Sequence, residues 1–428
     1  MIRYQEAIHI IEETALQNQM GVEIVGTGQA LGRITVEKIV SPEEVPHFTN
    51  TSMDGFAVFS KNTVNASQDN PIRLPVHGVI AAGDSVAYEI ASANKEGTTV
   101  EIMTGAPIPL NGYDAVAKIE DVKVIRNGDK EVREIEIYTP LKPFENIRKK
   151  GTDYQIGQIV IEKNAKTAPE HILALTSLGI CEIKVRKKPK IMILSTGSEL
   201  VDYTEKNLPP GFIRNSTGPF LISAFQNMGL EASFLGTVKD DPAEYESKLK
   251  IALNEGADII ISTGAVSMGK YDFIPDVLSQ MGAKTFFHKV AIRPGKPILF
   301  AQFQNSKKST SFFGIPGNPI STTVGFRFFL DPYIRAVYGL NRETPLKIKL
   351  NHEFEKSEGL RCFFKAKTVL NESIASVEAL KGQASYIVSS LVDANGWVVF
   401  AEEKVKQNTV DVVDVYPLQH SFEKGVFD

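Results

Sequence analysis

The sequence predicts a multidomain protein of α/β and β class, in which a domain with a parallel sheet is joined to β-rich domains. At 428 residues the chain exceeds what one hydrophobic core usually holds, and its length indicates about three domains. From Ile191 to about Tyr338, short apolar runs alternate with helical patterns, which is typical of a parallel sheet covered by helices. Over residues 72–138 and 346–426, short strand patterns follow one another between turn signals, which predicts β-rich modules on either side.

Composition and charge restrict the kind of partner. Hydrophobic residues make up 43% of the chain and charged residues 23%, as in folded soluble proteins. The formal net charge of −4 gives no general attraction for nucleic acid or anionic lipid, so we expect neither nucleic acid nor a membrane as partner. No apolar run approaches the ~20 residues that span a bilayer, and Cys181 and Cys362 lie far apart in the chain. We therefore expect a cytoplasmic protein that acts on small molecules.

The first part of the chain predicts one helix and then mainly short strands. Residues 1–14 carry acidic side chains inside an apolar pattern, which indicates an amphipathic helix rather than a signal peptide. Short strands are expected at 22–25 and 33–36, and a second helix is expected at 168–179, where the apolar spacing ends in glycine. A basic run at 184–190 marks a domain boundary and is more typical of a solvated linker than of a binding patch.

Residues 258–262 are the stretch around which the α/β domain is predicted to form. Their β-branched side chains suit a strand buried on both faces of a parallel sheet. In such a sheet the turns after the carboxyl ends of the strands share one edge, where ligands usually bind. Four polar turns should therefore converge, at 195–200, 237–244, 263–272 and 316–321. The small residues of the third turn leave backbone amides free to meet an anion.

Charged residues gather at this predicted edge. Three carboxylates follow strand ends: Glu199, Asp240 and Asp272. Three cations lie on a segment stiffened by two prolines: Lys289, Arg293 and Lys296. Because Mg²⁺ prefers one or two carboxylates together with waters and phosphate oxygens, this combination predicts a Mg²⁺ site beside a phosphorylated or oxyanionic ligand.

Structural roles compete for the same carboxylates. Thr196 and Glu199 have the spacing of a helix capping box. Asp241 starts a second such box, which would leave Asp240 with a free carboxylate. Asp272 suits a cap for the helix that follows it. Each residue taken singly favours the structural role, whereas the carboxylates and cations taken together favour a ligand site.

Two residues of the β-rich segment have the same ambiguity. Asp54 precedes a glycine, which is ordinary turn chemistry. Thr104 begins a rigid loop, where its hydroxyl would suit a cap on a loop amide. Neither residue taken alone indicates a function.

Seven motifs, taken in their order and spacing, resemble the MoeA family of molybdopterin molybdenumtransferases, which also supplies the C-terminal part of gephyrin. The motifs lie at 53–57, 103–107, 146–151, 195–200, 263–272, 296–297 and 316–319. Each motif alone is weak, but the resemblance covers essentially the whole chain.

The resemblance implies four domains. A mixed linker domain would comprise residues 1–44 and 141–184, with a β domain inserted at 45–140. A MogA-like α/β/α domain that binds molybdopterin would follow at 185–340, and a C-terminal β domain at 341–428. The family pattern also implies a homodimer, with a cleft between the MogA-like domain of one subunit and the inserted β domain of the other.

The resemblance further implies that the protein inserts molybdate into adenylylated molybdopterin, with Mg²⁺-dependent release of AMP. The expected catalytic residues are Asp54, Thr104, Glu199, Asp240 and Asp272, of which the last three would bind the metal. Lys289 and Arg293 would neutralise phosphate or molybdate. The other expected substrate contacts are Ser195, Thr196, Gly197, Gly264, Ser267, Lys296, Pro316, Gly317, Asn318 and Pro319.

Three positions depart from the family pattern. Ala265 stands where the family usually has the second glycine of the central turn, which restricts a positive φ there. Arg293 replaces a frequent lysine and presents a planar fork instead of a compact ammonium. Tyr386 ends a loop that in the family often reads Gln-Gly-Ser-Gly, so that this loop is expected to be narrower.

Two other functions stay open. The α/β domain could itself adenylylate molybdopterin, with consumption of ATP, although the inserted β domain with Asp54 is not needed for that reaction. Otherwise a MogA-type adenylyltransferase would hand over the substrate in a transient contact. The second alternative is a non-catalytic binding or scaffold paralogue, as gephyrin anchors receptors, but the chain has no long linker and no second fused module.

Overall fold

The computed structural model describes residues 1–84, 96–109, 112–127, 131–266, 273–304, 308–371, 374–409 and 411–418. The chain forms two compact units. The larger unit contains Met1–Glu37, Asn164–Ala168 and Glu182–Asp428, and the smaller unit contains Lys38–Lys163 and Pro169–Cys181. None of the helices in the described ranges has the length and apolar character needed to cross a membrane.

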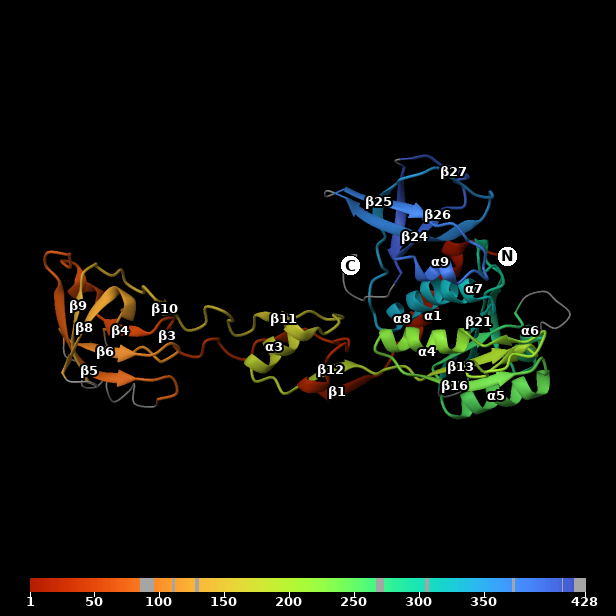
Figure 1. The fold of residues 1–428 in the computed structure, drawn as a ribbon. Helices are drawn as coiled ribbons and strands as arrows, with labels where there is room; N and C mark the ends of the chain where they lie inside the picture. Colours follow the sequence, from red (N-terminus) through yellow and green to blue (C-terminus); the bar gives the residue numbers. More distant parts are fainter. Residues whose placement is uncertain are drawn as a thin grey trace. The chain divides into compact units, whose positions relative to one another are not determined.

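A six-stranded sheet, as far as the chain is described, forms the centre of the larger unit (Figure 1). Its strands lie in the order β16 (Ala232–Val238), β13 (Ile191–Thr196), β17 (Ile259–Thr263), β21 (Ser309–Ile315), β20 (Leu299–Gln304) and β18 (Lys284–His288). β17 is buried along its whole length and runs parallel to β13 and β21, which confirms the buried strand predicted there.

β20 departs from the predicted parallel arrangement. It is antiparallel to both of its neighbours, β18 and β21. The reason is the short connection between Gln304 and Ser309, because two parallel neighbours need a crossover of about a dozen residues or more. The sheet is therefore mixed, with its parallel part at the β13 and β17 end.

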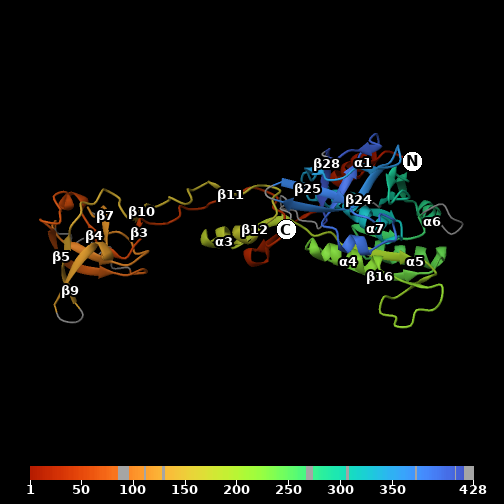
Figure 2. The same cartoon turned by 45° about the horizontal axis from the view of Figure 1, so that its top comes forward.

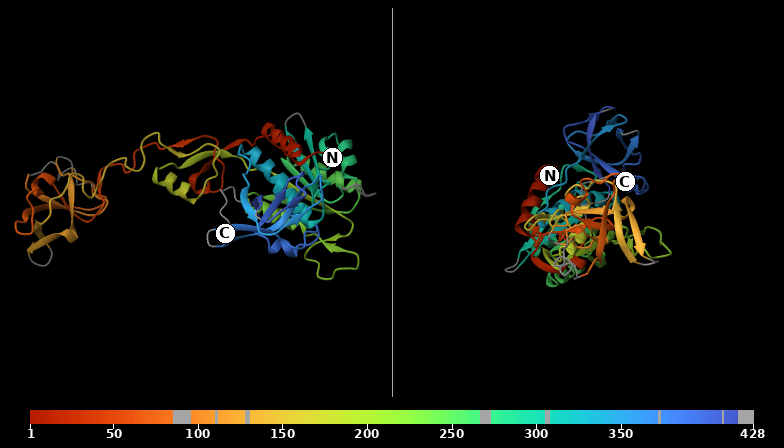
Figure 3. Two further views of the ribbon diagram at one scale, coloured as in Figure 1. Left: turned by 90° about the horizontal axis from the view of Figure 1, so that it is seen from above. Right: turned by 90° about the vertical axis from the view of Figure 1, so that its left-hand side faces the viewer.

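Helices cover both faces of this sheet (Figures 1 and 3). Ile191 and Ile193 of β13 enter one core, and Met192 and Leu194 enter another, because successive side chains of a strand point to opposite faces. The first core is shared with α1 (Tyr4–Gln17), α4 (Thr217–Asn227), α7 (Pro319–Gly325), a π-helical turn (Phe326–Leu330) and α8 (Asp331–Val337). The second core is shared with α5 (Pro242–Asn254) and α6 (Ile274–Gln280).

A second sheet holds the C-terminal strands of the larger unit (Figure 2). Its order is β19 (Ile292–Arg293), β24 (Arg361–Asn371), β25 (Ile374–Ala379), β22 (Leu346–Leu350), β28 (Val412–Pro417) and β26 (Gly396–Phe400). β26 also pairs with β24, so the sheet closes on itself and surrounds a core of its own. The smaller elements here are β23 (Phe354–Glu355), β27 (Lys406–Gln407) and α9 (Ser389–Val392). These strands confirm the predicted C-terminal β module.

Short pairings complete the larger unit. β1 (Val22–Gly26) is antiparallel to β12 (Glu182–Arg186), and β14 (Leu200–Val201) is parallel to β15 (Ile213–Arg214). The strand expected at 33–36 is wrong, since Ile34 and Thr35 form only isolated bridges. Their backbone contacts go mostly to the irregular segment 164–168 rather than to a continuous strand.

The smaller unit is β-rich, as predicted. Its main sheet has the order β7 (Ala115–Lys118), β4 (Gly55–Val58), β6 (Thr99–Ile102), β5 (Ile72–Ile80), β9 (Glu131–Ile137) and β8 (Val122–Asn127) in the described ranges. Ala57 enters one small core and Phe56 another, on opposite faces of β4. The remaining elements are β2 (Ile39–Val40), β3 (Asn50–Thr51), β10 (Ile147–Arg148), β11 (Ile159–Ile161) and α3 (Pro169–Ser177), the last of which confirms the predicted second helix.

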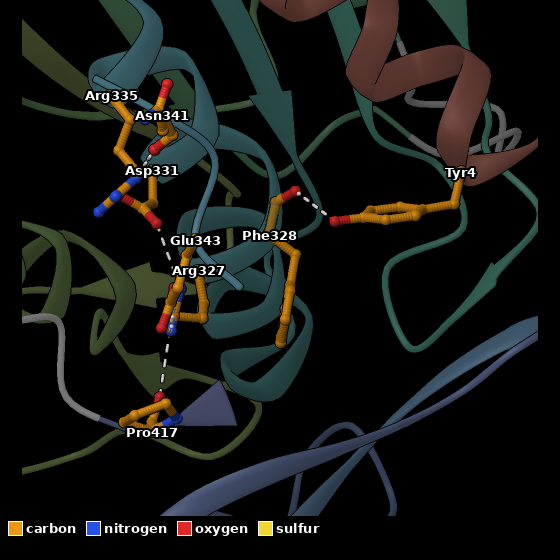
Figure 4. A network of polar contacts seen from close by, with 8 residues as sticks. All are labelled: Tyr4, Arg327, Phe328, Asp331, Arg335, Asn341, Glu343 and Pro417. Carbon is orange, nitrogen blue, oxygen red and sulfur yellow. Dashed lines mark hydrogen bonds and ion pairs between the residues drawn. The ribbon is translucent and has the colours of Figure 1, made fainter. Parts of the chain in front are cut away.

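A buried ionic network fixes the π-helical turn of the larger unit (Figure 4). Arg327 contacts Asp331 at 3.2 Å and Glu343 at 2.6 Å, and its Nε donates to the Pro417 carbonyl at 3.2 Å. The side chains of Arg327 and Asp331 are only 4% and 1% exposed. The network therefore connects the long helical segment to β28 of the C-terminal sheet.

Candidate functional site

A cavity of about 550 Å³ lies at the carboxyl edge of the α/β sheet in the larger unit. The turns after β13, β16, β17 and β21 all contribute to its wall, which confirms the predicted convergence of four polar turns. Its described lining is Thr196, Gly197, Glu199, Leu200, Ile213, Arg214, Asn215, Ser216, Thr217, Asp240, Thr263, Gly264, Ala265, Gly317, Asn318, Pro319 and Tyr386.

Gly264 allows two of these turns to touch. Its φ is +92°, and an added Cβ would overlap the carbonyl oxygen of Thr196. Its backbone amide donates to the Ile315 carbonyl at 3.0 Å, which ties the turn to the end of β21. Ala265 follows with a φ of +49°, so the family position usually held by glycine does require a positive φ in this chain.

Buried hydroxyl groups hold the floor of the cavity. Thr263 Oγ1 donates to Ser195 Oγ at 3.0 Å and lies 3.1 Å from Thr217 Oγ1. Thr196 Oγ1 donates to the Thr263 carbonyl at 3.3 Å. Ser195 is fully buried beneath the lining, so its hydroxyl positions neighbouring strand ends, whereas Thr196 and Gly197 are part of the cavity wall.

The capping box proposed for Thr196 and Glu199 is wrong. The chain bends at Gly197, where φ is +151°, and continues into the short strand β14 rather than into a helix. The Thr196 hydroxyl is bonded to the neighbouring strand instead of to a helix amide. Glu199 is consequently available to line the cavity.

Asp241 is confirmed as the N-cap of α5, but the reciprocal half of the second capping box is not formed, because the Asp241 amide donates to the Lys239 carbonyl at 2.6 Å. The Asp241 carboxylate accepts from the amides of Ala243 at 2.8 Å and Glu244 at 3.3 Å, at the start of α5. Asp240 Oδ2 accepts from the Ser198 amide at 3.1 Å, and Ser198 Oγ accepts from the Asp240 amide at 3.1 Å. This reciprocal pair positions the Asp240 carboxylate on the cavity wall.

Glu199 and Asp240 fit the requirements of a Mg²⁺ ion that is also bound by substrate phosphate. Both carboxylates line one cavity, and Mg²⁺ in phosphate sites is held by one or two carboxylates. The described residues contain no group of three or more histidine, cysteine, aspartate or glutamate side chains close enough to hold a metal by themselves. The predicted third ligand, Asp272, and the predicted contact Ser267 lie outside the described residues.

The predicted cations lie apart from the described lining of this cavity. Lys289 follows β18 with a φ of +78° and is half-buried. Arg293 belongs to β19, at the edge of the C-terminal sheet, and both Arg293 and Lys296 are exposed. Arg214 is a cation that the structure places in the lining instead.

The fourth turn contributes Gly317, Asn318 and Pro319 to the wall, where α7 begins. Pro316 is buried behind them, and its carbonyl accepts from Thr322 Oγ1 at 2.9 Å. The predicted residues of this turn are therefore brought together.

The cavity wall also includes residues 214–217 and Tyr386, which were not predicted as site residues from the sequence. The first stretch is a polar run directly before α4, which was a usable signal because polar residues at a helix start often face a ligand site. Tyr386 comes from the C-terminal β module, so its arrival at this cavity depends on contacts between segments that are distant in sequence.

Asp54 and Thr104 form a second polar site, in the smaller unit. Asp54 Oδ1 accepts from the Thr104 amide at 2.7 Å and from the Thr104 hydroxyl at 2.9 Å, and both residues are exposed. The amide, and then the hydroxyl, lower the pKa of Asp54 below its usual value. The Thr104 hydroxyl is thus bonded to a carboxylate and does not cap a loop amide as the structural alternative proposed. Gly55 is required beside them, since an added Cβ would overlap the Ala117 carbonyl oxygen.

Three family models match successive parts of the chain. The MoeA N-terminal region, described as domains I and II, matches residues 2–179. The probable molybdopterin binding domain matches residues 192–336, and the MoeA C-terminal region, described as domain IV, matches residues 347–418.

Relatives and solved structures agree with these models. The molybdopterin molybdenumtransferase of Synechococcus elongatus is 35% identical over 399 residues, which cover 93% of this chain and 95% of that relative. The protein of the same name from Staphylococcus aureus is 34% identical over 388 residues, covering 90% of this chain and 88% of that relative. The crystal structure of the molybdopterin biosynthesis MoeA protein from Pyrococcus horikosii has a TM-score of 0.78 at 30% identity, covering 98% of this chain and 100% of that chain. This chain belongs to the MoeA family of molybdopterin molybdenumtransferases.

Proposed function

We propose that this chain inserts molybdenum into molybdopterin, with adenylylated molybdopterin and molybdate as substrates and AMP as a released product. The observation that carries this proposal is the cavity in which Glu199 and Asp240 share a wall with the glycine-containing turns at Gly264 and Gly317. Carboxylates suit a metal bound to phosphate, and backbone amides suit the phosphate itself. The site thus has carboxylates that suit a metal ion and backbone amides that suit the phosphoanhydride bound to that ion.

The proposed reaction has two parts, and both concentrate negative charge. An oxygen nucleophile attacks the adenylyl phosphorus, and the phosphoanhydride bond to molybdopterin breaks. The dithiolene sulfurs replace molybdate oxygens, which leave as water after protonation. Fixed donors that face the developing charge lower the barrier of such steps. We propose that Arg214 and the amides of the turn at Gly317, which belong to the described wall, act in this way, whereas the Gly264 amide is already bonded to the Ile315 carbonyl.

We assign Mg²⁺ to Glu199 and Asp240, with Asp272 as the expected third ligand. When bound, the ion would neutralise phosphate oxygens of the substrate. Ser198 holds the Asp240 carboxylate in place through its amide, so that no reorientation of this carboxylate is needed. Lys289, Arg293 and Lys296 are kept as proposed contacts of phosphate or molybdate.

We further propose that Asp54 and Thr104 act in a cleft of a homodimer, each subunit supplying them to the other. Both Thr104 hydrogen bonds go to Oδ1 of Asp54, which leaves Oδ2 for substrate or for a proton. The lowered pKa keeps the carboxylate ionised at neutral pH. We also propose that the chain has the four domains given above and that it is cytoplasmic. Its substrate would be delivered by a MogA-type adenylyltransferase.

The test is AMP release by purified protein given adenylylated molybdopterin, Mg²⁺ and molybdate. We expect release that requires molybdate and that falls at least about 100-fold in Asp54→Ala, as for loss of a general acid or base. Asp84→Ala is the matched control, because Asp84 is also exposed and also accepts a backbone amide, that of Ala81 at 2.8 Å.

Other results would change the proposal. Substrate binding without AMP release, with either molybdate or tungstate, would favour a non-catalytic binding paralogue. Pyrophosphate release from ATP and unmodified molybdopterin would favour the adenylyltransferase reaction. An Asp54→Ala variant as active as Asp84→Ala would remove Asp54 from the catalytic group.

A further inference from the structure

Lys365 on β24 is a buried cation with backbone oxygens as partners. The residue is fully buried, and no carboxylate in the described ranges forms an ion pair with it. Its Nζ donates to the Gly382 carbonyl at 2.7 Å and to the Ile387 carbonyl at 2.9 Å. Burial lowers the pKa of Lys365, because it removes water from the charged form. Burial of a charged group costs free energy, and the two hydrogen bonds from Lys365 offset part of that cost. They also join β24 to the residues that carry the two carbonyls.

The two carbonyls bracket one loop, residues 382–387. The Gln383 side chain pairs with the Lys365 backbone, accepting from its amide at 3.0 Å and donating to its carbonyl at 2.9 Å. In the middle of the loop, the Ser385 carbonyl accepts from the Ile320 amide at 3.0 Å, at the start of α7. The loop is therefore fixed at both ends by Lys365 and in the middle by the helix that follows the fourth cavity turn.

Tyr386 is the residue that this loop delivers to the cavity. It lies in the cavity lining together with Gly317, Asn318 and Pro319, and it is 72% exposed. Tyr386 is the aromatic residue in the described lining, and its ring offers a flat apolar surface, which the aliphatic side chains of Leu200 and Ile213 do not. Adenylylated molybdopterin carries two flat nitrogen heterocycles, the pyrimidinone ring of the pterin and the adenine.

We propose that Tyr386 contacts a planar heterocycle of the substrate, and that Lys365 is the positioning residue that holds the loop of Tyr386 in place. This inference rests on the proposed function, since it concerns the substrate of the same cavity. The pterin half and the adenine half of the substrate each contain a flat nitrogen heterocycle joined to a phosphate. Molybdopterin and AMP, used as separate probes, show which of the two halves contacts Tyr386.

The first experiment measures the dissociation constants of molybdopterin, under anaerobic conditions, and of AMP with Mg²⁺. Stacking of a base on an aromatic side chain is worth about 1–3 kcal/mol, so we expect Tyr386→Ala to weaken one probe roughly 5-fold to 150-fold. Tyr386→Phe keeps the ring and should bind within about twofold of the original protein. The probe that is weakened identifies the heterocycle that meets Tyr386.

The second experiment tests the role of Lys365 with a double-mutant cycle. We expect Lys365→Met to weaken the same probe in the original protein, and to have little further effect when Tyr386 is already alanine. Lys365→Arg should restore binding, since it keeps a buried donor. A merely structural lysine would weaken binding equally in both backgrounds.

Lys356→Met is the matched control. Lys356 is also buried, and its Nζ donates to the carbonyls of Leu360 at 2.8 Å and Glu402 at 3.2 Å, on loops outside the described lining. We expect this variant to bind both probes normally.

The outcomes separate this inference from the function on which it rests. Equal binding of both probes by the original protein and Tyr386→Ala would overturn the inference alone. An original protein that binds neither probe would overturn the cavity as the substrate site, and the inference with it. Equal effects of Lys365→Met in both backgrounds would remove Lys365 as a positioning residue.

Discussion

Gly264 and Ala265 show how strictly the central turn depends on single residues. Gly264 cannot accept a Cβ, because the Thr196 carbonyl occupies that place. Ala265 has a Cβ and still adopts a left-handed backbone conformation, which costs an L-residue about 1–2 kcal/mol. The turn therefore keeps its shape in spite of local strain, and the contacts of β13, β17 and β21 on either side must compensate for it.

A prediction at the residue scale concerns the protonation of Asp54. Thr104→Val removes the hydroxyl and keeps the amide, so the Asp54 pKa should rise toward the usual value of about 3.9 without reaching it. Because the folded pKa is depressed, ionised Asp54 stabilises the fold above about pH 4, and this contribution is lost as pH falls through the folded pKa. A carboxyl-carbon NMR titration, assigned with Asp54→Asn, measures the midpoint.

Thr204→Val is the control for this titration. The amide and hydroxyl of Thr204 both donate to Asp202 Oδ1, and they lower the pKa of Asp202 in the same way. This variant should move the Asp202 midpoint and leave AMP release unchanged. An unchanged Asp54 midpoint in Thr104→Val would show that the hydroxyl does not act on the carboxylate.

At the scale of elements, the π-helical turn depends on Arg327. Arg327→Met leaves the buried Asp331 and the nearby Glu343 without their common cation. Removal of one partner from a buried pair costs about 3–5 kcal/mol, so we expect a loss of this size in the free energy of unfolding of the larger unit. Urea unfolding, followed by circular dichroism, measures it.

The exposed pair Lys250 and Glu246 on α5 provides the comparison. Their charged atoms lie 2.7 Å apart, but the side chains are 61% and 36% exposed. Lys250→Met should cost less than about 0.5 kcal/mol, since water already screens this pair. Equal losses in the two variants would contradict a special role for the buried network.

At the scale of elements, the sequence predicted the local strand ends but not the pairings between distant strands. The strand ends before Thr196, Asp240 and Gly264 were predictable from local apolar runs, and a parallel sheet then brings their turns to one edge. The position of Arg293 was not predictable, because it depends on the pairing of β19 with β24, more than sixty residues later. Helix signals misled at Thr196, where a strand pairing replaced the expected cap.

The smaller unit shows the same division between local and distant signals. Its strands were predictable from alternating patterns and turn residues. The hydrogen bonds between Asp54 and Thr104 join residues fifty positions apart, and neither local motif contains a sign of the other. Pairings of this kind follow from sheet register, which a single sequence specifies only weakly.

At the scale of the whole molecule, the two units have separate cores. Each hydrophobic cluster found in the described residues lies within one unit. We therefore expect calorimetry to resolve at least two unfolding transitions. Phe56→Ala, which empties a fully buried site in the smaller unit, should lower one transition, and Arg327→Met should lower another. A single transition that both variants shift equally would contradict independent cores.

The packing of α1 has a consequence for the way this protein is made. Tyr4 of α1 donates to the carbonyl of Phe328, a residue 324 positions later in the chain. At a synthesis rate of about 5–20 residues per second, the ribosome needs roughly 15–65 s to produce that partner. During this interval the smaller unit can complete its fold, while the apolar face of α1 is still exposed to solvent. This helix is thus buried only after residues more than three hundred positions later have been made, and until then its apolar face is open to chaperones that bind nascent chains.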